Sequence, residues 1–119
     1  MQIKSHDINT IKIAEVVSDE IFIKSAQDGL DLLGDIYYQG FDKVVIYEEN
    51  ITPEFFDLKT KIAGDILQKF SNYRISLAIV GDFEKYPGKS IRDFIFESNK
   101  TKHINFKETL EEALERLGR

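Results

Sequence analysis

Apolar and polar residues alternate along the beginning of the chain. The alternation covers Gln2–Lys4 and Ile11–Val16, and the interval Asp7–Thr10 between them is rich in turn-forming residues. Strict alternation is typical of a strand with one packed face and one wetted face. The pattern therefore predicts an N-terminal β-hairpin.

A helical spacing follows the hairpin. Ser25 is expected to be the N-cap, with Asp28 reaching back in a capping box, and Gly40 is a suitable residue for the C-terminal end. Gly29 and Gly34 inside this helix either permit close packing of the helix on the sheet or loosen it locally. The apolar positions of the predicted helix are Ala26, Leu30, Leu33 and Tyr37.

A short buried strand and a long helix occupy the middle of the chain. Lys43–Tyr47 is a strand pattern, and a helix is expected from Thr52, with Pro53 at its first position, to about Asn72. Ile75–Val80 is almost continuously apolar, as in a central parallel strand covered on both faces. The apolar residues of the long helix are Phe55, Phe56, Ile62, Ala63, Ile66, Leu67 and Phe70.

Two further helices and one strand complete the pattern. Ser90 and Asp93 form a second expected capping box, His103–Phe106 is a short strand, and Thr109 with Glu112 caps the last helix. A hairpin followed by repeating α-β units predicts an α/β fold, with a mixed, mostly parallel sheet, right-handed crossovers and about four helices. No linker or repeat divides the chain, so residues 1–119 are expected to form one domain.

Composition narrows the function classes. The 119 residues carry a net charge of -5, which argues against a nucleic-acid partner, because bound phosphates need basic side chains. The absence of cysteine excludes disulfides, thiol catalysis and Cys-ligated zinc. No apolar run is long enough to cross a bilayer and no signal peptide is recognisable, so we expect a cytoplasmic protein without membrane contact. No motif indicates a cofactor or a metal site.

Polar residues follow two strands that we expect to be parallel neighbours, so they should meet at one edge of the sheet. Such a group could hold a divalent cation, perform acid/base chemistry or contact a protein partner. We favour the partner surface, to which Phe55 or Phe56 would contribute if one of them faces outward. The polar members of this group are Glu48, Glu49, Asn50, Thr52 and Asp82.

A second candidate lies at the start of the third expected helix. Gly88-Lys89-Ser90 is similar to the end of a phosphate-binding loop, but that motif needs a glycine where Phe83 stands. Lys89, Ser90 and Arg92 could still hold an anion with the free helix N–H groups. A capping serine flanked by solvated bases is the favoured alternative, as it is for the whole basic run from Lys85 to Lys102. His6 and His103 lie on different elements, with no carboxylate or serine at the spacing of a catalytic triad.

The order of elements resembles the STAS domain, named for sulfate transporters and anti-sigma-factor antagonists. The closing run Ile104–Leu114 is similar to the end of many such domains. At finer scale, Glu48–Leu58 and Ala78–Phe83 resemble an uncharacterised bacterial family of small domains of unknown function. In anti-sigma-factor antagonists, an Asp-Ser pair precedes the second helix, and a partner kinase phosphorylates the serine. Thr52 and Pro53 occupy these positions here, so the usual phosphoacceptor is missing.

These observations lead to two main hypotheses. The first is a non-catalytic regulatory module that binds a protein partner of unknown identity through the turn from Glu48 to Phe56 and through Asp82. The second is a domain that binds an anionic small molecule or nucleotide at Lys89, Ser90 and Arg92. An enzyme that uses the carboxylates is a third alternative. The outer edge of the hairpin could also pair with a second copy of the chain and form a homodimer.

Overall fold

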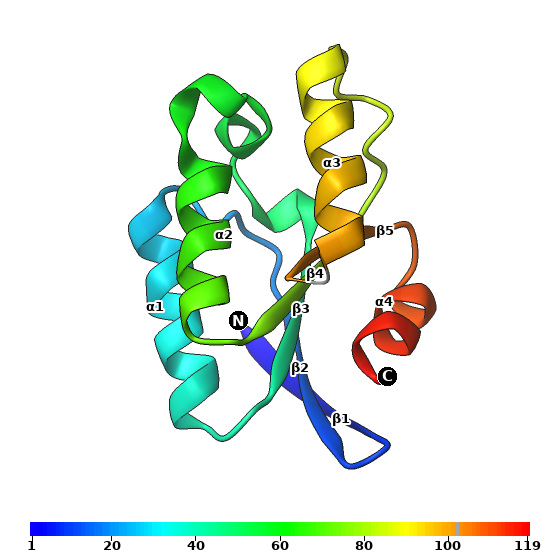
Figure 1. Ribbon diagram of the computed structural model, residues 1–119. Helices are drawn as coiled ribbons and strands as arrows, with labels where there is room; N and C mark the ends of the chain where they lie inside the picture. Colours follow the sequence, from blue (N-terminus) through cyan, green and yellow to red (C-terminus); the bar gives the residue numbers. More distant parts are fainter. Residues whose placement is uncertain (102) are drawn as a thin grey trace.

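A computed structural model describes residues 1–101 and 103–119, and it shows an α/β fold built on one five-stranded sheet (Figure 1). Lys102, the last cation of the basic run noted above, lies outside the described residues. The strand order is β1-β2-β3-β4-β5, with β1 antiparallel to β2 and all later neighbours parallel. The strands are β1 (Gln2–Ile8), β2 (Ile11–Val17), β3 (Lys43–Tyr47), β4 (Ser76–Val80) and β5 (Ile104–Lys107).

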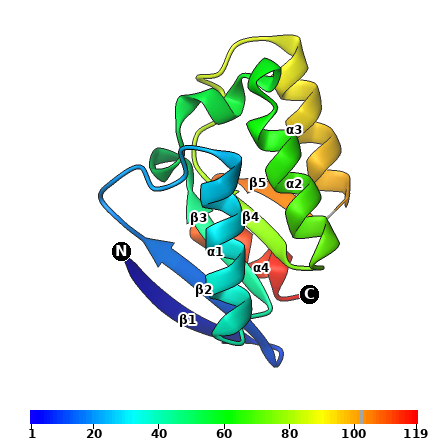
Figure 2. The same cartoon turned by 90° about the vertical axis from the view of Figure 1, so that its left-hand side faces the viewer.

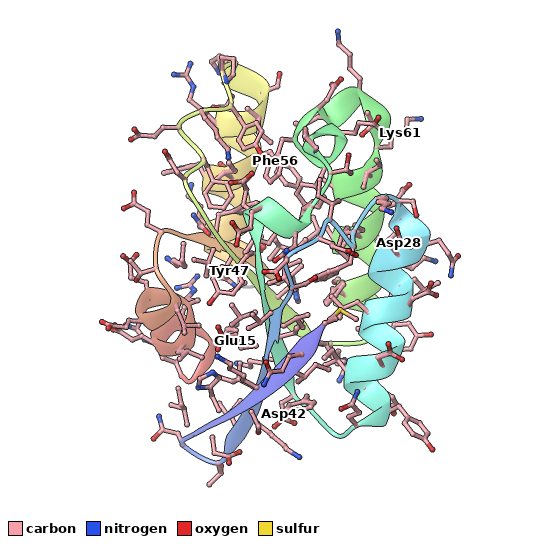
Figure 3. All side chains as sticks on the ribbon, turned by 180° about the vertical axis from the view of Figure 1, so that it is seen from behind. Glu15, Asp28, Asp42, Tyr47, Phe56 and Lys61 are labelled. Carbon is pink, nitrogen blue, oxygen red and sulfur yellow. The ribbon has the colours of Figure 1, made fainter. Side chains whose placement is uncertain are left out.

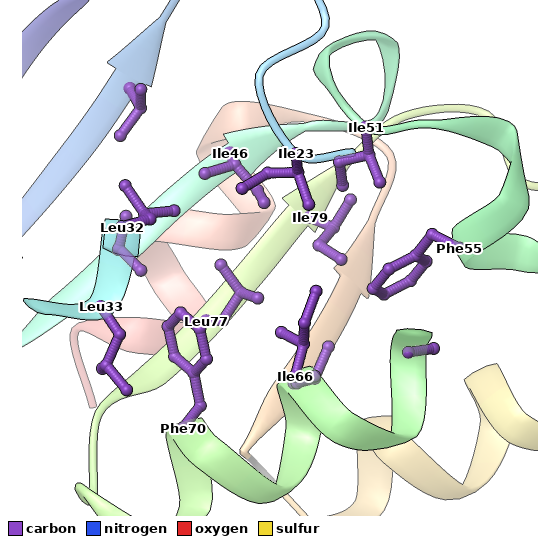
Figure 4. Packing of buried hydrophobic residues seen from close by; sticks show 14 of the residues in the cluster. Ile23, Leu32, Leu33, Ile46, Ile51, Phe55, Ile66, Phe70, Leu77 and Ile79 are labelled. Atoms are coloured by element: carbon purple, nitrogen blue, oxygen red, sulfur yellow. The ribbon is translucent and has the colours of Figure 1, made fainter. Parts of the chain in front are cut away.

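Helices cover both faces of the sheet unequally (Figures 1 and 2). Alternate residues of the strands point to opposite faces, so Val44 and Leu77 join the larger apolar core beneath α1, α2 and α3, while Val45 packs in a smaller core beneath α4. Figure 4 shows the larger core. The helices are α1 (Ala26–Tyr38), α2 (Ile62–Asn72), α3 (Lys89–Thr101) and α4 (Leu110–Leu117).

The hairpin turns through Asn9 and Thr10, both in the left-handed region with φ angles of 52° and 68°. Positive φ at both central residues is the signature of a two-residue type I′ turn, whose twist matches that of the strands. The turn sets the register, which pairs Ile8 with Ile11 and His6 with Ile13.

The predicted helix caps are confirmed at two of three positions. The Asp28 N–H donates to Ser25 Oγ at 3.2 Å, and the Asp28 carboxylate accepts from the backbone of Lys24 instead of completing a box with Ser25. Thr109 likewise caps α4. The expected cap at Ser90 is wrong, because α3 already begins at Lys89. Gly88, with φ of +116°, ends the preceding loop, and its carbonyl accepts the first helical bond.

The long helix predicted from Thr52 is also wrong in its first half. Residues 53–56 and 58–60 form short 3₁₀ turns, named η2 and η3, and α2 begins only at Ile62 and ends as predicted at Asn72. Both Phe55 and Phe56 are buried within the first of these turns, being 1% and 5% exposed. Thr60 Oγ1 stabilises the irregular segment by donating to the Glu54 carbonyl at 2.8 Å.

The two glycines of α1 have different surroundings. A Cβ on Gly29 would lie 2.7 Å from Ile66 Cγ1, whereas nothing lies within 4 Å of the corresponding position on Gly34. Close packing at Gly29 is therefore real, but it brings α1 against α2, not against the sheet. In the described parts of the chain, no helix has both the length and the apolar character that a membrane span requires.

Candidate functional site: the strand rim and the α3–β5 groove

Strands β3 and β4 end side by side, as the sequence predicts, and Tyr47 is paired with Val80. The next residues on each strand, Glu48 and Gly81, are in close contact, because a Cβ on Gly81 would lie only 2.5 Å from Glu48 Cβ. Only glycine fits here without displacing the glutamate. The carboxyl ends of the two strands therefore form one rim, which we call the strand rim and which consists of residues 48–54 and 81–82.

Glu48 holds the loop after β4 against the strand rim. Its side chain is buried, and its carboxylate accepts from the Tyr86 hydroxyl at 2.6 Å and pairs with Lys85 Nζ at 2.7 Å. The Tyr86 ring stacks on Phe56, with 4.1 Å between ring centroids. Burial, then the hydrogen bond to Glu48 and its charge, raise the pKa of Tyr86 above its usual value. The tyrosine is therefore a protonated donor at neutral pH.

Asn50 joins the strand rim to the segment between β2 and α1. Its side chain is 1% exposed, and Nδ2 donates to the carbonyls of Ser18 and Glu20, both at 2.8 Å. Its backbone carbonyl accepts from Phe22 and Ile23. These contacts use Asn50 inside the protein, so its side chain is not available to a partner. Its Oδ1 atom is buried and has no hydrogen-bond partner among the described residues.

Exposed rim residues are mostly acidic. Glu49, Glu54 and Asp82 are exposed, and none of them forms an ion pair within the described chain. Thr52 is half-buried, and its hydroxyl accepts from the Glu54 N–H at 3.4 Å. Neither Phe55 nor Phe56 faces outward, because both are buried, so neither adds to an exposed surface here. Over residues 1–101 and 103–119, no group of three or more acidic or histidine side chains is placed to hold a metal ion.

The anion-binding candidates do not converge on one point. Lys89 and Ser90 line a shallow hollow beside Pro53, whereas Arg92 lines a different groove. The exposed Lys89 ammonium pairs with Asp93 at 2.8 Å, and this hydrogen bond and charge raise the pKa of Lys89. Lys89 is thus already engaged, and only Arg92 faces a sizeable hollow.

That hollow is the α3–β5 groove, which lies between α3, the loop of residues 83–88 and the end of β5. Its volume is about 880 Å³. It opens at the carboxyl ends of β4 and β5, where the Gly81 N–H donates to the Lys107 carbonyl at 3.0 Å. Its lining combines aromatic and polar side chains, among them Phe83, Tyr86, Phe96, Phe106, Asn99 and Lys107.

A further polar network lies on the sheet face that carries α4 (Figure 3). The Tyr47 hydroxyl donates to Glu15 Oε2 at 2.5 Å, and His6 Nε2 lies 2.8 Å from Glu15 Oε1. His6 was considered only as a member of a catalytic triad, and this contact with Glu15 was not predicted. The signal was present in the hairpin, because a two-residue turn at Asn9-Thr10 places His6 and Glu15 diagonally on the same face.

The protonation states in this network are well separated. Burial alone would raise the pKa of Glu15, but the hydrogen bonds from Tyr47 and His6, and then the charges of His6 and Lys4, lower it overall. Burial, followed by the hydrogen bond and charge of Glu15 and the charge of Glu49, raises the pKa of Tyr47 above its usual value. Glu15 is therefore ionised and Tyr47 protonated at neutral pH, so neither is poised for proton transfer there.

Comparison with known proteins gives one match. A family model covers residues 8–117, from the end of β1 through α4, and the family is described as "Domain of unknown function (DUF4180)". Neither the curated proteins nor the solved structures include a match to the chain.

Proposed function

The chain belongs to the DUF4180 family, and from that premise we propose that it is a cytoplasmic, STAS-like regulatory module that binds a protein partner without catalysis. The contact surface that we propose is the exposed part of the strand rim. Its members are Glu49, Thr52, Glu54 and Asp82.

The observation that carries this proposal is an ordered acidic surface whose carboxylates form no ion pair within the described chain, although Asp82 accepts from the Glu84 N–H at 3.1 Å. Glu49, Glu54 and Asp82 lack ion-pair partners in the described chain, although the backbone beneath them is held by Glu48, Asn50 and the 3₁₀ turns. A surface that is already ordered costs less conformational entropy when a partner binds. Its charge favours a partner with a basic patch, because opposite potentials speed encounter and select the partner.

The resemblance to STAS domains supports a regulatory role and also limits it. The order of a hairpin followed by α-β units agrees with that family, and the proposed surface includes the turn where anti-sigma-factor antagonists meet their kinase. Pro53 stands at the phosphoacceptor position, and the Thr52 hydroxyl already accepts from the backbone. We therefore propose binding that does not depend on phosphorylation of this turn.

The protonation states described above support a non-catalytic role. Glu15 is ionised and two tyrosines stay protonated at neutral pH, so these buried groups hold charge and structure. A general acid or base works best with a pKa near the working pH. The lowered pKa of Glu15 and the raised pKa values of Tyr47 and Tyr86 move these three groups away from that range.

Charge reversal on the strand rim tests the proposal. Tagged wild-type chain and the variant Glu49→Lys/Asp82→Lys are used to capture proteins from a native lysate, with recovery quantified by mass spectrometry. We expect loss of the specific partner from the variant, because four units of charge change on the surface. Asp35→Lys/Glu97→Lys, on exposed helix positions away from the rim, is the control of equal charge and should retain the partner.

Equal recovery of every captured protein by the rim variant and the wild type would contradict the proposal. Untagged copies of the chain among the captured proteins would indicate the homodimer. We propose the outer edge of β1 as its interface, because β1 pairs with β2 on one side only.

A further inference from the structure

We propose that the α3–β5 groove is a binding site for a small organic molecule with a flat apolar body and a single carboxylate. None of the strand-rim residues lines the groove. This inference is therefore independent of the proposed partner surface, and each can fail without the other.

The position and size of the groove are those of a ligand site. In open α/β sheets, ligands bind outside the carboxyl ends of the parallel strands, and here β4 and β5 both end at the groove. The volume of about 880 Å³ falls in the range of roughly 300–1,000 Å³ that is typical of small-molecule pockets.

Aromatic rings supply the apolar part of the site. Phe83 and Phe106 meet edge to face, with ring centroids 5.1 Å apart, and Phe94 supports Phe106 from α3 at 6.1 Å. Phe96 is 62% exposed, and Lys100 Nζ lies 4.3 Å from its ring centroid. A large exposed aromatic side chain beside an aromatic hollow favours a flat apolar ligand, which can stack or pack against ring edges.

Polar groups in the groove favour one carboxylate. Arg92 and Lys107 form no ion pair within residues 1–101 and 103–119. Asn99 uses Oδ1 to accept from the Phe106 N–H at 2.7 Å, which leaves its two amide N–H groups as donors for a ligand. The planar guanidinium of Arg92 matches the two oxygens of a carboxylate.

Two acidic side chains in the same lining restrict the ligand further. Glu84 and Glu108 also border the groove, so the four charged residues there sum to zero. A doubly charged phosphate ester would gain from Arg92 and Lys107 but would be repelled by both glutamates. One carboxylate needs only the guanidinium of Arg92, whereas the balanced lining has no excess of cations for a phosphate ester, so the groove favours a carboxylate over a nucleotide.

The groove is formed before any ligand binds. The contacts of Tyr86 with Glu48 and Phe56 hold the loop that makes one wall of the groove. Tyr86 is itself a lining residue, and both its ring and its hydroxyl are held by these contacts. Binding therefore does not have to order this wall, which preserves affinity.

Titration with a panel of aromatic carboxylates, followed by amide chemical shifts of the labelled full chain, tests the site. The panel is benzoate, cinnamate, indole-3-acetate and 2-naphthoate, with 2-naphthamide and 2-naphthyl phosphate as matched neutral and doubly charged probes. We expect at least one carboxylate to give saturable shifts at Arg92, Phe96 and Lys107. The amide and phosphate probes should bind about tenfold more weakly.

Two exposed substitutions make the test specific. Arg92→Met and Phe96→Ala should each weaken binding of the responsive carboxylate about tenfold. Lys69→Met, an exposed cation on α2, is the matched control and should bind like the wild type. Glu49→Lys/Glu54→Lys should also retain binding, which separates this site from the partner surface.

Three results would overturn the proposal. The first is the absence of saturable shifts in the groove for all four carboxylates up to about 5 mM. The second is equal affinity of Arg92→Met and the wild type, and the third is tighter binding of the phosphate probe than of 2-naphthoate.

Discussion

Two buried glutamates of this protein each accept a hydrogen bond from a tyrosine, but in very different surroundings. The Tyr47 hydroxyl donates to the Glu15 carboxylate at 2.5 Å on the face of the sheet. The Tyr86 hydroxyl donates to the Glu48 carboxylate at 2.6 Å at the strand rim. In both pairs the pKa of the tyrosine is raised by burial and then by its glutamate. The chemistry is shared, and the difference lies in what each pair holds in place.

The third member of each network shows the difference. His6, Glu15 and Tyr47 come from three adjacent strands, so the regular register of the sheet already brings them together. Tyr86 and Lys85 come from an irregular loop, which Glu48 holds against β3. The sheet network therefore stabilises the scaffold, whereas the rim network fixes a loop that borders both candidate binding surfaces.

The largest expected effect comes from filling the space beside Glu48. Gly81→Ala places a Cβ about where Glu48 Cβ already lies, at 2.5 Å. Overpacking of this kind costs about 1–3 kcal/mol, and we expect the upper part of that range, because both residues directly follow paired strands and have little freedom to move apart. The free energy of unfolding in urea measures the loss. Tyr86, but not Tyr47, should change its environment in the spectra of the variant.

Gly64→Ala is the control for this substitution. Nothing lies within 4 Å of a Cβ at Gly64 in α2, so this change should stabilise the helix by up to about 1 kcal/mol. If Gly81→Ala proved as stable as Gly64→Ala, Glu48 would be able to move aside. The rim network could then no longer be described as holding the loop in a fixed position.

Removing one hydroxyl from each network gives the next largest effect. Tyr47→Phe leaves Glu15 with only His6, which is charged only when protonated, whereas Tyr86→Phe leaves Glu48 with the permanent charge of Lys85. A buried charged acceptor that loses a donor costs about 1–3 kcal/mol. We therefore expect about 2 kcal/mol for Tyr47→Phe and about 1 kcal/mol for Tyr86→Phe at neutral pH.

Tyr38→Phe serves as the matched control, because Tyr38 is 90% exposed, and surface changes of this kind stay within about 0.5 kcal/mol. Equal losses of stability for Tyr47→Phe and Tyr86→Phe would mean that the remaining partner of each glutamate, His6 or Lys85, makes no difference. A larger loss of stability for Tyr86→Phe than for Tyr47→Phe would mean that the rim network, and not the sheet network, contributes more to the stability of the fold.

The sequence predicted most of the fold because its hydrophobic pattern is regular wherever the backbone is regular. Apolar runs marked β3 and β4 as buried neighbours, and their parallel pairing is confirmed. The α/β class, the four helices and the antiparallel hairpin follow from the same periodicities. Caps at Ser25 and Thr109 were recognisable because their side chains act on residues close in sequence.

The errors lie where contacts distant in sequence determine the backbone. Phe55 and Phe56 were assigned to a helix, but they lie in a 3₁₀ turn, where Phe56 stacks on the distant Tyr86, and the left-handed Lys61 precedes α2. Glu48 was expected to be part of an exposed surface, but Tyr86, 38 residues away, covers it. Helical periodicity carries no information about either contact, so it could not predict them.

The sequence predicted that the exits of β3 and β4 share one edge of the sheet, but not which of the residues there are buried and which are exposed. Because β3 and β4 were expected to be parallel neighbours, residues 48–52 and 82 were expected to follow them at the same edge of the sheet, and they do. Which of them remain exposed depends on the loop of residues 83–88, whose course the sequence pattern does not determine. The contact of His6 with Glu15 could have been predicted from the sequence, because the register of a two-residue hairpin follows from its turn.

The dependence of stability on pH has the smallest effect near neutral pH. It also compares the two networks group by group, because each titrating residue acts in its own pH range. Glu15 has a lowered pKa in the folded protein, so its contribution is complete above the usual value of 4.5 and is lost as the pH falls through the lowered value. The tyrosines have raised pKa values, so their contributions are complete below pH 10 and are lost as the pH rises through the raised values.

Urea titrations at a series of pH values separate these contributions. Glu15→Gln should flatten the acid side of the stability profile, and Tyr47→Phe and Tyr86→Phe should each flatten part of the alkaline side. Since the two networks share no residue, the double variant Tyr47→Phe/Tyr86→Phe should lose the sum of the two alkaline contributions. A double variant no flatter than either single one would show that the networks are coupled across β3, through the adjacent residues Tyr47 and Glu48, and that sheet and rim respond as one unit.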